Sequence, residues 1–247
     1  MPELPRVVVT RRVEQTARFA KKLRVAGFHP LIFPTIELQA MPAPDLNRAL
    51  AQIENFDWLL FSSANAVHFF FCRLDALQLS PRLPRTGAVG TATARKLAEY
   101  DVQPDFMPDS FTGEALAAGL GDLSGQRILL PRARLGRPQI VDRLRDQGAD
   151  VSDIALYDTV TAASDPMALQ ELALGYEAIT FASPSSVRGF LEISGAKPLG
   201  SAVVACIGPV TAAAAAECGL PVDLVPDEYT LDGLVQALTR YFGETKI

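Results

Sequence analysis

The feature of this sequence that most constrains its fold is an internal duplication. Residues 88–120 align with residues 206–238 without a gap, at an offset of 118 positions, and eleven aligned positions are identical. The identical pairs are Gly90/Gly208, Thr93/Thr211, Ala94/Ala212, Ala98/Ala216, Glu99/Glu217, Asp105/Asp223, Pro108/Pro226, Asp109/Asp227, Thr112/Thr230, Leu116/Leu234 and Leu120/Leu238. Ordinary residue usage predicts roughly two or three identities in such a window. The match therefore indicates a real repeat.

The duplication extends to the earlier parts of both copies. The acidic residue Asp57 aligns with Glu177 at an offset of 120. Further identities at offsets of 120 and 121 are Phe61/Phe181, Ser63/Ser183, Val67/Val187, Phe70/Phe190, Arg6/Arg127, Arg11/Arg132, Leu23/Leu144 and Gly27/Gly148. The chain is one unit of about 120 residues written twice, and so long a period indicates a duplicated half rather than a solenoid.

Each copy contains a buried strand, a small polar turn and an apolar helix in direct succession, at residues 56–70 and 176–190. A turn of this kind leaves free backbone amides at the N-terminus of a helix, where α/β domains hold anions. Further strands are expected at residues 6–10, 102–107 and 151–160, with helices between them. This alternation predicts an α/β fold of two similar domains, each a parallel sheet flanked by helices, with the polar turns gathered at one edge.

Composition excludes several classes of function. A net charge of −5 and a pI near 5.1 argue against a nucleic-acid partner, which usually requires a basic face. The longest apolar run, residues 202–216, is shorter than the ~20 residues of a membrane span. Three cysteines without a C-x-x-C spacing indicate a reducing compartment. We expect a soluble cytoplasmic protein.

The sequence also lacks the common catalytic motifs. It contains no glycine-rich dinucleotide-binding pattern, no phosphate-binding loop, no H-E-x-x-H and no nucleophile elbow. A structural or surface role is favoured for the two histidines, His29 and His68, and neither is expected to bind a metal. No metal site and no cofactor are predicted.

The small polar turns remain as candidate binding sites, because they occur at corresponding strand ends in both copies. The candidate residues are Ser63, Asn65, Gly90, Thr91, Thr112, Ser183, Ser185, Thr211 and Thr230. The alternative is helix capping, worth ~1 kcal/mol for each cap. Thr91 or Thr93, Thr112 and Thr230 are expected to be such caps. Arg11 and Arg132 occupy equivalent positions after a first strand, and the guanidinium fork suits carboxylates.

Tyr157 is the one candidate proton donor on a segment between the predicted units. The alternative is a strand tyrosine that is buried for packing, and the residues alone do not decide between the two.

Taken in order, these segments resemble the uroporphyrinogen-III synthase family over nearly the whole chain. The resemblance rests on Val9-Thr10-Arg11, residues 61–67, Ala88-Val89-Gly90, Leu130-Pro131-Arg132, Tyr157-Asp158-Thr159, residues 181–187, residues 207–212 and residues 229–234. It implies a hinged pair of flavodoxin-like α/β domains, joined by two linker strands around a central cleft. Residues 1–37 and 160–247 would form a discontinuous domain, and residues 38–159 an inserted one.

The resemblance also implies a reaction. Family members convert linear hydroxymethylbilane into uroporphyrinogen III, with loss of water and inversion of the terminal pyrrole ring, in the tetrapyrrole pathway to haem and sirohaem. Without an enzyme the precursor closes to the uninverted isomer, so the protein supplies mainly positioning and electrostatic stabilisation. Tyr157 matches the tyrosine proposed in this family to help the hydroxyl leave. The candidate turns and the two arginines would hold the carboxylates.

The expected protein is thus a cofactor-independent lyase that acts as a monomer, with possible transient contact to the upstream bilane-producing enzyme. The alternative is a two-domain sensor or binding protein for a small polyanion, which would have no use for Tyr157.

Overall fold

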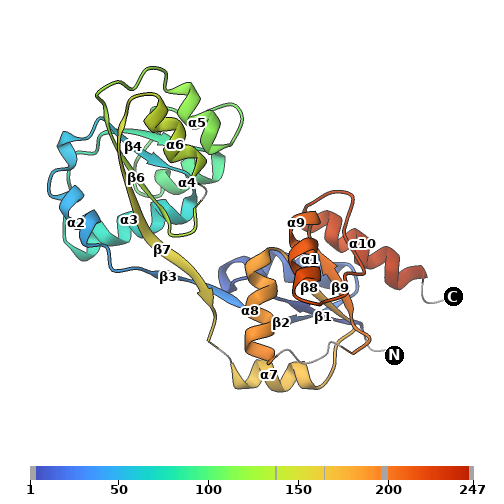
Figure 1. Ribbon diagram of the computed structural model, residues 1–247. Helices are drawn as coiled ribbons and strands as arrows, with labels where there is room; N and C mark the ends of the chain where they lie inside the picture. Colours follow the sequence, from blue (N-terminus) through green and yellow to red (C-terminus); the bar gives the residue numbers. More distant parts are fainter. Residues whose placement is uncertain (1–3, 137, 164, 196–199, 245–247) are drawn as a thin grey trace. The chain divides into compact units, whose positions relative to one another are not determined.

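A computed structural model describes residues 4–136, 138–163, 165–195 and 200–244. The chain divides into two compact units (Figure 1): unit 1 comprises Met1–Glu37 and Thr159–Ile247, and unit 2 comprises Leu38–Asp158. Among the described residues, no helix is both long and apolar enough to cross a lipid bilayer.

Unit 1 is built on a parallel sheet with the strand order β2-β1-β8-β9. Its strands are β1 (Arg6–Val9), β2 (His29–Ile32), β8 (Ala178–Phe181) and β9 (Val203–Cys206). Its helices are α1 (Val13–Val25), α7 (Pro166–Ala173), α8 (Pro184–Ser194), α9 (Pro209–Glu217) and α10 (Leu231–Glu244). β8 and β9 are buried along their whole length, as strands covered on both faces must be.

Unit 2 carries the sheet with the order β3-β7-β6-β4-β5, in which β7, β6, β4 and β5 are parallel. Its strands are β3 (Ile36–Ala40), β4 (Trp58–Phe61), β5 (Arg85–Ala88), β6 (Arg127–Ala133) and β7 (Asp150–Thr161), of which β3 and β7 continue into unit 1. Its helices are α2 (Pro44–Leu50), the 3₁₀ turn η1 (Ile53–Asn55), α3 (Ala64–Ala76), α4 (Thr91–Ala98), α5 (Gly113–Gly119) and α6 (Gln139–Asp146).

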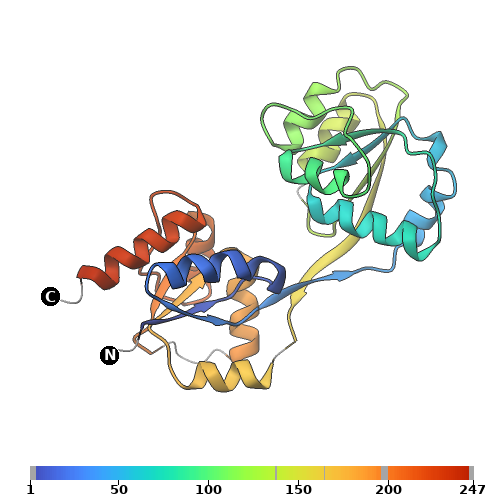
Figure 2. The same ribbon diagram turned by 180° about the vertical axis from the view of Figure 1, so that it is seen from behind.

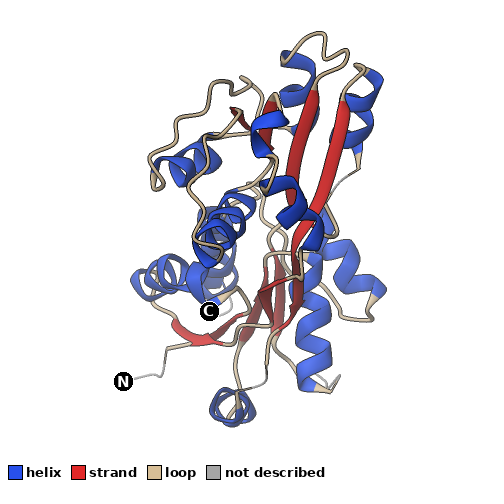
Figure 3. Ribbon diagram, turned by 90° about the vertical axis from the view of Figure 1, so that its left-hand side faces the viewer, coloured by secondary structure: helices blue, strands red, loops and turns tan. Residues whose placement is uncertain are grey.

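Helices cover both faces of each sheet (Figure 3). In unit 1, Val7 packs in one core with Phe19 of α1 and Leu234 of α10, and Val8 packs in the opposite core with Phe190 of α8. Figure 2 shows α1 and α10 side by side on the same face of this sheet.

Unit 2 repeats the arrangement. Leu59 faces a core that contains Phe70 of α3, and Leu60 faces the core of Leu116 and Leu144 from α5 and α6.

The sequence repeat is a repeat of topology. Under the sequence offsets, β2-β1-β8-β9 of unit 1 correspond to β7-β6-β4-β5 of unit 2, in the same order. The registers correspond as well, because Val7 pairs with Ala178 and the equivalent Ile128 pairs with Trp58. Each unit therefore combines the opening β-α-β segment of one copy with the rest of the other.

The duplicated acidic residues hold the same places in both sheets. Asp57 accepts a hydrogen bond from the backbone N–H of Arg127 (2.8 Å), and Glu177 accepts one from Arg6 (2.6 Å). Asp105 and Asp223 likewise accept from the backbone N–H groups of Thr86 (2.6 Å) and Val204 (2.8 Å). Backbone hydrogen bonding at the sheet margins explains why an acidic residue recurs at both pairs of positions.

Two local predictions are wrong. Residues 102–107 form no strand and make a single bridge from Phe106 to Gly87, since Pro104 lacks an N–H and Asp105 turns its carboxylate back to the sheet. The helix α4 is not capped by Thr91 or Thr93 either. Gly90 is its N-cap residue, and Thr91 is already its first helical residue.

Candidate active site

The polar turn after β4 places a serine beside a tyrosine hydroxyl. Ser63 is the N-cap residue of α3, and its Oγ accepts a hydrogen bond from the backbone N–H of Ala66 (3.1 Å). The same Oγ lies 3.1 Å from the Oη of Tyr157. Ser63 therefore caps its helix, as the alternative expected, and its side chain also contacts the predicted proton donor, Tyr157.

Tyr157 lies in β7, and only 5% of its surface is exposed. Its ring stacks on Phe69 of α3, with centroids 4.7 Å apart and planes 14° from parallel. The ring is therefore buried for packing, as the alternative expected, but its hydroxyl contacts the half-buried Ser63. The ring is fixed by apolar contact and the O–H by a polar one.

A β-bulge directs this ring. Along β6, Arg132 pairs with Ala155 and Ala133 pairs with Tyr157, so Leu156 has no partner in β6. Consecutive strand residues normally face opposite sides, but Leu156 and Tyr157 both pack into the core beneath α3. The extra residue turns Tyr157 toward α3, the kind of re-aiming for which bulges are known.

Arg134, directly after β6, holds the same part of β7. Its backbone N–H donates to the carbonyl oxygen of Tyr157 (2.9 Å), and its guanidinium pairs with the carboxylate of Asp158. The sequence reasoning missed both contacts, because they depend on the bulge.

A pocket of about 270 Å³ lies at the same edge of the unit 2 sheet. Residues that line it include Ser62, Phe111, Thr112, Glu114, Arg132 and Gly136. We call it the Arg132 pocket. Because binding sites for drug-sized ligands start at about 300 Å³, this pocket suits one substituent or ring of a larger molecule.

Arg132 is held in a fixed orientation by Asp153. The Nε and Nη2 atoms donate to the two carboxylate oxygens at 2.5 and 2.6 Å, and this bidentate pair raises the pKa of Arg132. Its Nη1 is buried and has no hydrogen-bond partner. A Cβ at Gly136 would lie 2.5 Å from that nitrogen, so the glycine leaves room for the guanidinium.

The other unit 2 candidates occupy the first turns of neighbouring helices. Thr112 caps α5 by accepting from the N–H of Ala115 (3.1 Å), and it lines the Arg132 pocket. Asn65 is half-buried in the first turn of α3, Gly90 is half-buried at the start of α4, and Thr91 is exposed there.

In unit 1, Ser183 caps α8 by accepting from the N–H of Ser186 (3.2 Å), and its Oγ lies 3.0 Å from that of Ser185. Thr230 caps α10 through the N–H of Gly233 (3.0 Å). Thr211 is only 4% exposed, so its side chain is enclosed by the unit.

Arg11 repeats the feature seen at Arg132. Its Nη2 donates to Gln15 (3.0 Å), while its Nε is buried without a partner. Burial, and then the charge of Arg12, lower the pKa of Arg11. Among the described residues, the buried guanidinium nitrogens without a partner belong to Arg11 and Arg132, which are equivalent in the repeat.

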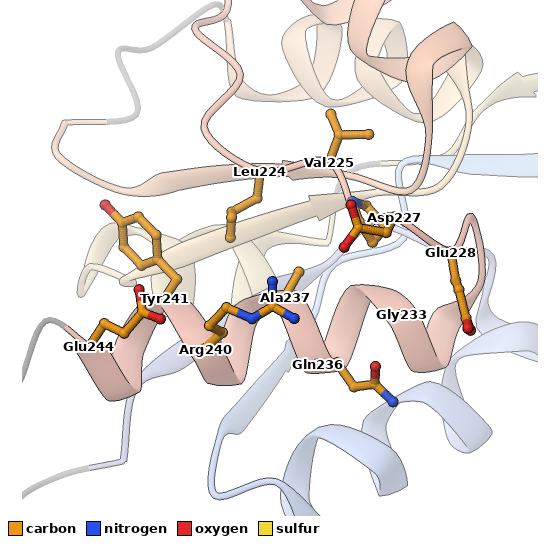
Figure 4. Close-up of a pocket in the computed structure, with 11 residues that line it drawn as sticks. Leu224, Val225, Asp227, Glu228, Gly233, Gln236, Ala237, Arg240, Tyr241 and Glu244 are labelled. Carbon is orange, nitrogen blue, oxygen red and sulfur yellow. The ribbon is translucent and has the colours of Figure 1, made fainter.

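Another groove in unit 1 has the wrong charge for an anion. Figure 4 shows this groove, of about 280 Å³, between α10 and residues 224–228. Asp227, Glu228 and Glu244 line it beside a single cation, Arg240. Like charges disfavour a polycarboxylate here. In the described part of the chain, no group of three or more His, Cys, Asp or Glu side chains could hold a metal ion.

The model of one protein family, described as uroporphyrinogen-III synthase HemD, matches residues 17–236. The chain belongs to the uroporphyrinogen-III synthase family. A uroporphyrinogen-III synthase of Synechococcus elongatus is 33% identical over 256 residues, which cover 97% of this chain and 96% of that protein. A chloroplastic uroporphyrinogen-III synthase of Oryza sativa subsp. japonica is 29% identical, with 99% and 84% covered.

Solved structures of uroporphyrinogen-III synthases share the fold. The Helicobacter pylori protein superposes with a TM-score of 0.67 at 19% identity, over 96% of this chain and 99% of that one. A mutant of the Thermus thermophilus protein gives a TM-score of 0.60 at 21% identity, over 97% and 99%. The predicted α/β fold with parallel sheets is confirmed.

Proposed function

We propose that this chain is an enzyme that cyclises linear hydroxymethylbilane to uroporphyrinogen III, with loss of water and inversion of the terminal pyrrole ring. The observation that carries this proposal is the family match over residues 17–236. The contact between Ser63 and Tyr157 supports it, because a sensor that only binds an anion needs no phenol at its polar turn.

In the proposed first step, the bond between the terminal methylene carbon and its hydroxyl breaks, and the hydroxyl leaves with a proton as water. The Oγ of Ser63 already accepts from Ala66 N–H, and it can accept a second hydrogen bond from Tyr157. As the Ser63 O–H gives its proton to the departing oxygen, the phenol of Tyr157 gives its own proton to Ser63, so Tyr157 is the net proton donor. Proton donation in this way is general acid catalysis by a tyrosine–serine pair.

The cation left on the chain is stabilised by the adjacent pyrrole, and it is attacked by the substituted carbon of the terminal ring to give a spiro intermediate. The spiro carbon then releases its bond to the neighbouring methylene, and the unsubstituted α-carbon of the same ring bonds to that methylene. Loss of the proton on this α-carbon restores the proton that was given to the departing hydroxyl. The protein contributes by holding a flexible polycarboxylate in the reactive geometry.

We propose that Arg11 and Arg132 each bind a substrate carboxylate. Each has a buried N–H without a partner, and a bound carboxylate would satisfy it. The hydroxyl and amide groups of Ser63, Asn65, Gly90, Thr91, Thr112, Ser183, Ser185, Thr211 and Thr230 are the proposed further donors. At Thr211 the backbone is the relevant group, since the side chain is enclosed.

The test is to generate hydroxymethylbilane enzymatically in the presence of the protein, oxidise the products to porphyrins and separate the isomers. We expect the type III isomer at a rate proportional to protein concentration. Type I alone, at the rate seen without protein, would overturn the proposal and favour the sensor.

We also propose that the chain works as a monomer in a reducing compartment such as the cytoplasm, since Cys72, Cys206 and Cys218 are free thiols. Transient contact with the bilane-producing enzyme would shorten the lifetime of a substrate that cyclises spontaneously. Light scattering, alone and with that enzyme, tests both points.

A further inference from the structure

Two exposed aromatic side chains occupy equivalent positions in the two copies. Phe111 is 57% exposed and Tyr229 is 62% exposed, which makes them the most exposed aromatic residues of the described chain. Under the offset of 118 they align with each other, although the residue types differ. A single exposed ring is ordinary on a protein surface, but its recurrence at the equivalent position of both copies points to a contact surface.

The backbone presents both rings in the same way. The N–H of Thr112 donates to Ser110 O at 2.7 Å, and the N–H of Thr230 donates to Glu228 O at 2.7 Å. Each bond joins residues i and i+2, so Phe111 and Tyr229 are the central residues of two γ-turns. A helix capped by the following threonine begins directly after each turn.

A glycine lies beneath each ring. A Cβ added to Gly90 would lie 3.3 Å from Phe111, and one added to Gly208 would lie 3.2 Å from Tyr229. Both glycines are N-cap residues, of α4 and α9, at the edge where the strands end. The rings therefore stand over the polar turns predicted to bind the substrate, with one side open to solvent.

In unit 2 the ring of Phe111 also lines a pocket. Phe111 lines the Arg132 pocket together with Ser62 and Thr112. The pocket thus combines an aromatic face with the buried, unpartnered N–H of Arg132. A flat heteroaromatic ring that carries a carboxylate side chain is complementary to both features when the carboxylate meets Arg132 and not Glu114, which also lines the pocket.

We propose that Phe111 and Tyr229 are substrate-binding residues that stack on pyrrole rings, one in each unit. This inference rests on the proposed function, whose substrate is a chain of pyrroles bearing carboxylates. Aromatic pairs prefer offset or edge-to-face contact and are worth about 0.5–1.5 kcal/mol beyond area burial, so loss of one ring raises KM about two- to tenfold.

The experiment compares Phe111→Leu with Phe111→Tyr, and Tyr229→Leu with Tyr229→Phe. The leucine variants keep apolar bulk and lose the ring, whereas the other two keep it. Tyr241→Leu is the matched control, since Tyr241 is an exposed aromatic residue on α10, 37% exposed, outside these turns. Phe111→Met replaces Phe111→Leu if urea unfolding shows that leucine disturbs the fold.

KM and kcat are measured with hydroxymethylbilane, and binding of uroporphyrin III is measured separately by its fluorescence. We expect a higher KM and weaker porphyrin binding in both leucine variants, and values near wild type in the ring-retaining variants and the control. Unchanged leucine variants, or equal loss in Phe111→Tyr, would overturn the inference and leave contact with another protein as the use of the rings. A wild-type chain that makes no type III isomer would contradict the proposed function instead, while porphyrin binding would still decide the role of the rings.

Discussion

We expect the substitution Tyr157→Phe to lower turnover far more than it lowers folding stability. The change deletes one oxygen atom and leaves the aromatic ring in place. Because the ring stacks on Phe69 at 4.7 Å, the packing of β7 against α3 is retained.

The cost in stability follows from one hydrogen bond. Tyr157 loses its contact with Ser63 Oγ at 3.1 Å, while Ser63 keeps its bond from the N–H of Ala66. No buried polar group is left without a partner, so the free energy of unfolding falls by about 1 kcal/mol.

The expected cost in rate is larger. A positioned general acid contributes roughly 10²–10⁴-fold. Each factor of ten corresponds to about 1.36 kcal/mol of activation free energy, so the barrier rises by at least about 2.7 kcal/mol.

The assay measures kcat for type III formation and the urea midpoint of each variant. Tyr100→Phe is the matched control, because Tyr100 belongs to the same unit and stacks on Phe71 at 4.2 Å. We expect Tyr100→Phe to keep wild-type kcat. A Tyr157→Phe protein with wild-type kcat, or one whose lost activity is matched by unfolding, would refute the role given to the phenol.

Three further predictions concern other residues. Asp153→Asn breaks the bidentate pair that orients Arg132, and we expect KM to rise about fivefold with kcat nearly unchanged, as steady-state kinetics would show. Asp105→Ala and Asp223→Ala each leave one backbone N–H at a sheet margin unpaired. Urea denaturation is expected to show that both substitutions lower the free energy of unfolding by a similar amount, about 1–2 kcal/mol. Unequal losses would contradict the equivalence of the copies. Burial raises the pKa of the Cys206 thiol from 9.0 to about 11. The stability linked to this thiol is therefore complete below about pH 9 and is lost as the pH rises through about 11. A disulfide reagent at pH 8 is expected to modify the thiol only after the protein unfolds.

Much of the fold was predictable because the duplication limits what the chain can form. Asp57 and Glu177 align because both accept a backbone N–H at the start of a strand in the other copy. Ser63 and Ser183 align because both cap the helix that follows the buried strand. Short-range rules of strand, turn and cap locate such residues without knowledge of the tertiary structure.

The parts that were not predictable depend on contacts distant in sequence. The bulge opposite Ala133 decides which face of the sheet Tyr157 occupies, and no local pattern in β7 reports it. Asp153 was missed because its importance comes from Arg132 on the neighbouring strand. The segment 102–107 has the apolar pattern of a strand, but its backbone makes only one bridge to the sheet.

The most direct test of the central claim is the ratio of type III to type I uroporphyrin, measured after oxidation, as increasing amounts of the chain are added to a fixed flux of hydroxymethylbilane. We expect a ratio that climbs until nearly all product is type III. A ratio that stays at the value of the uncatalysed reaction, at every concentration of folded protein, would contradict it.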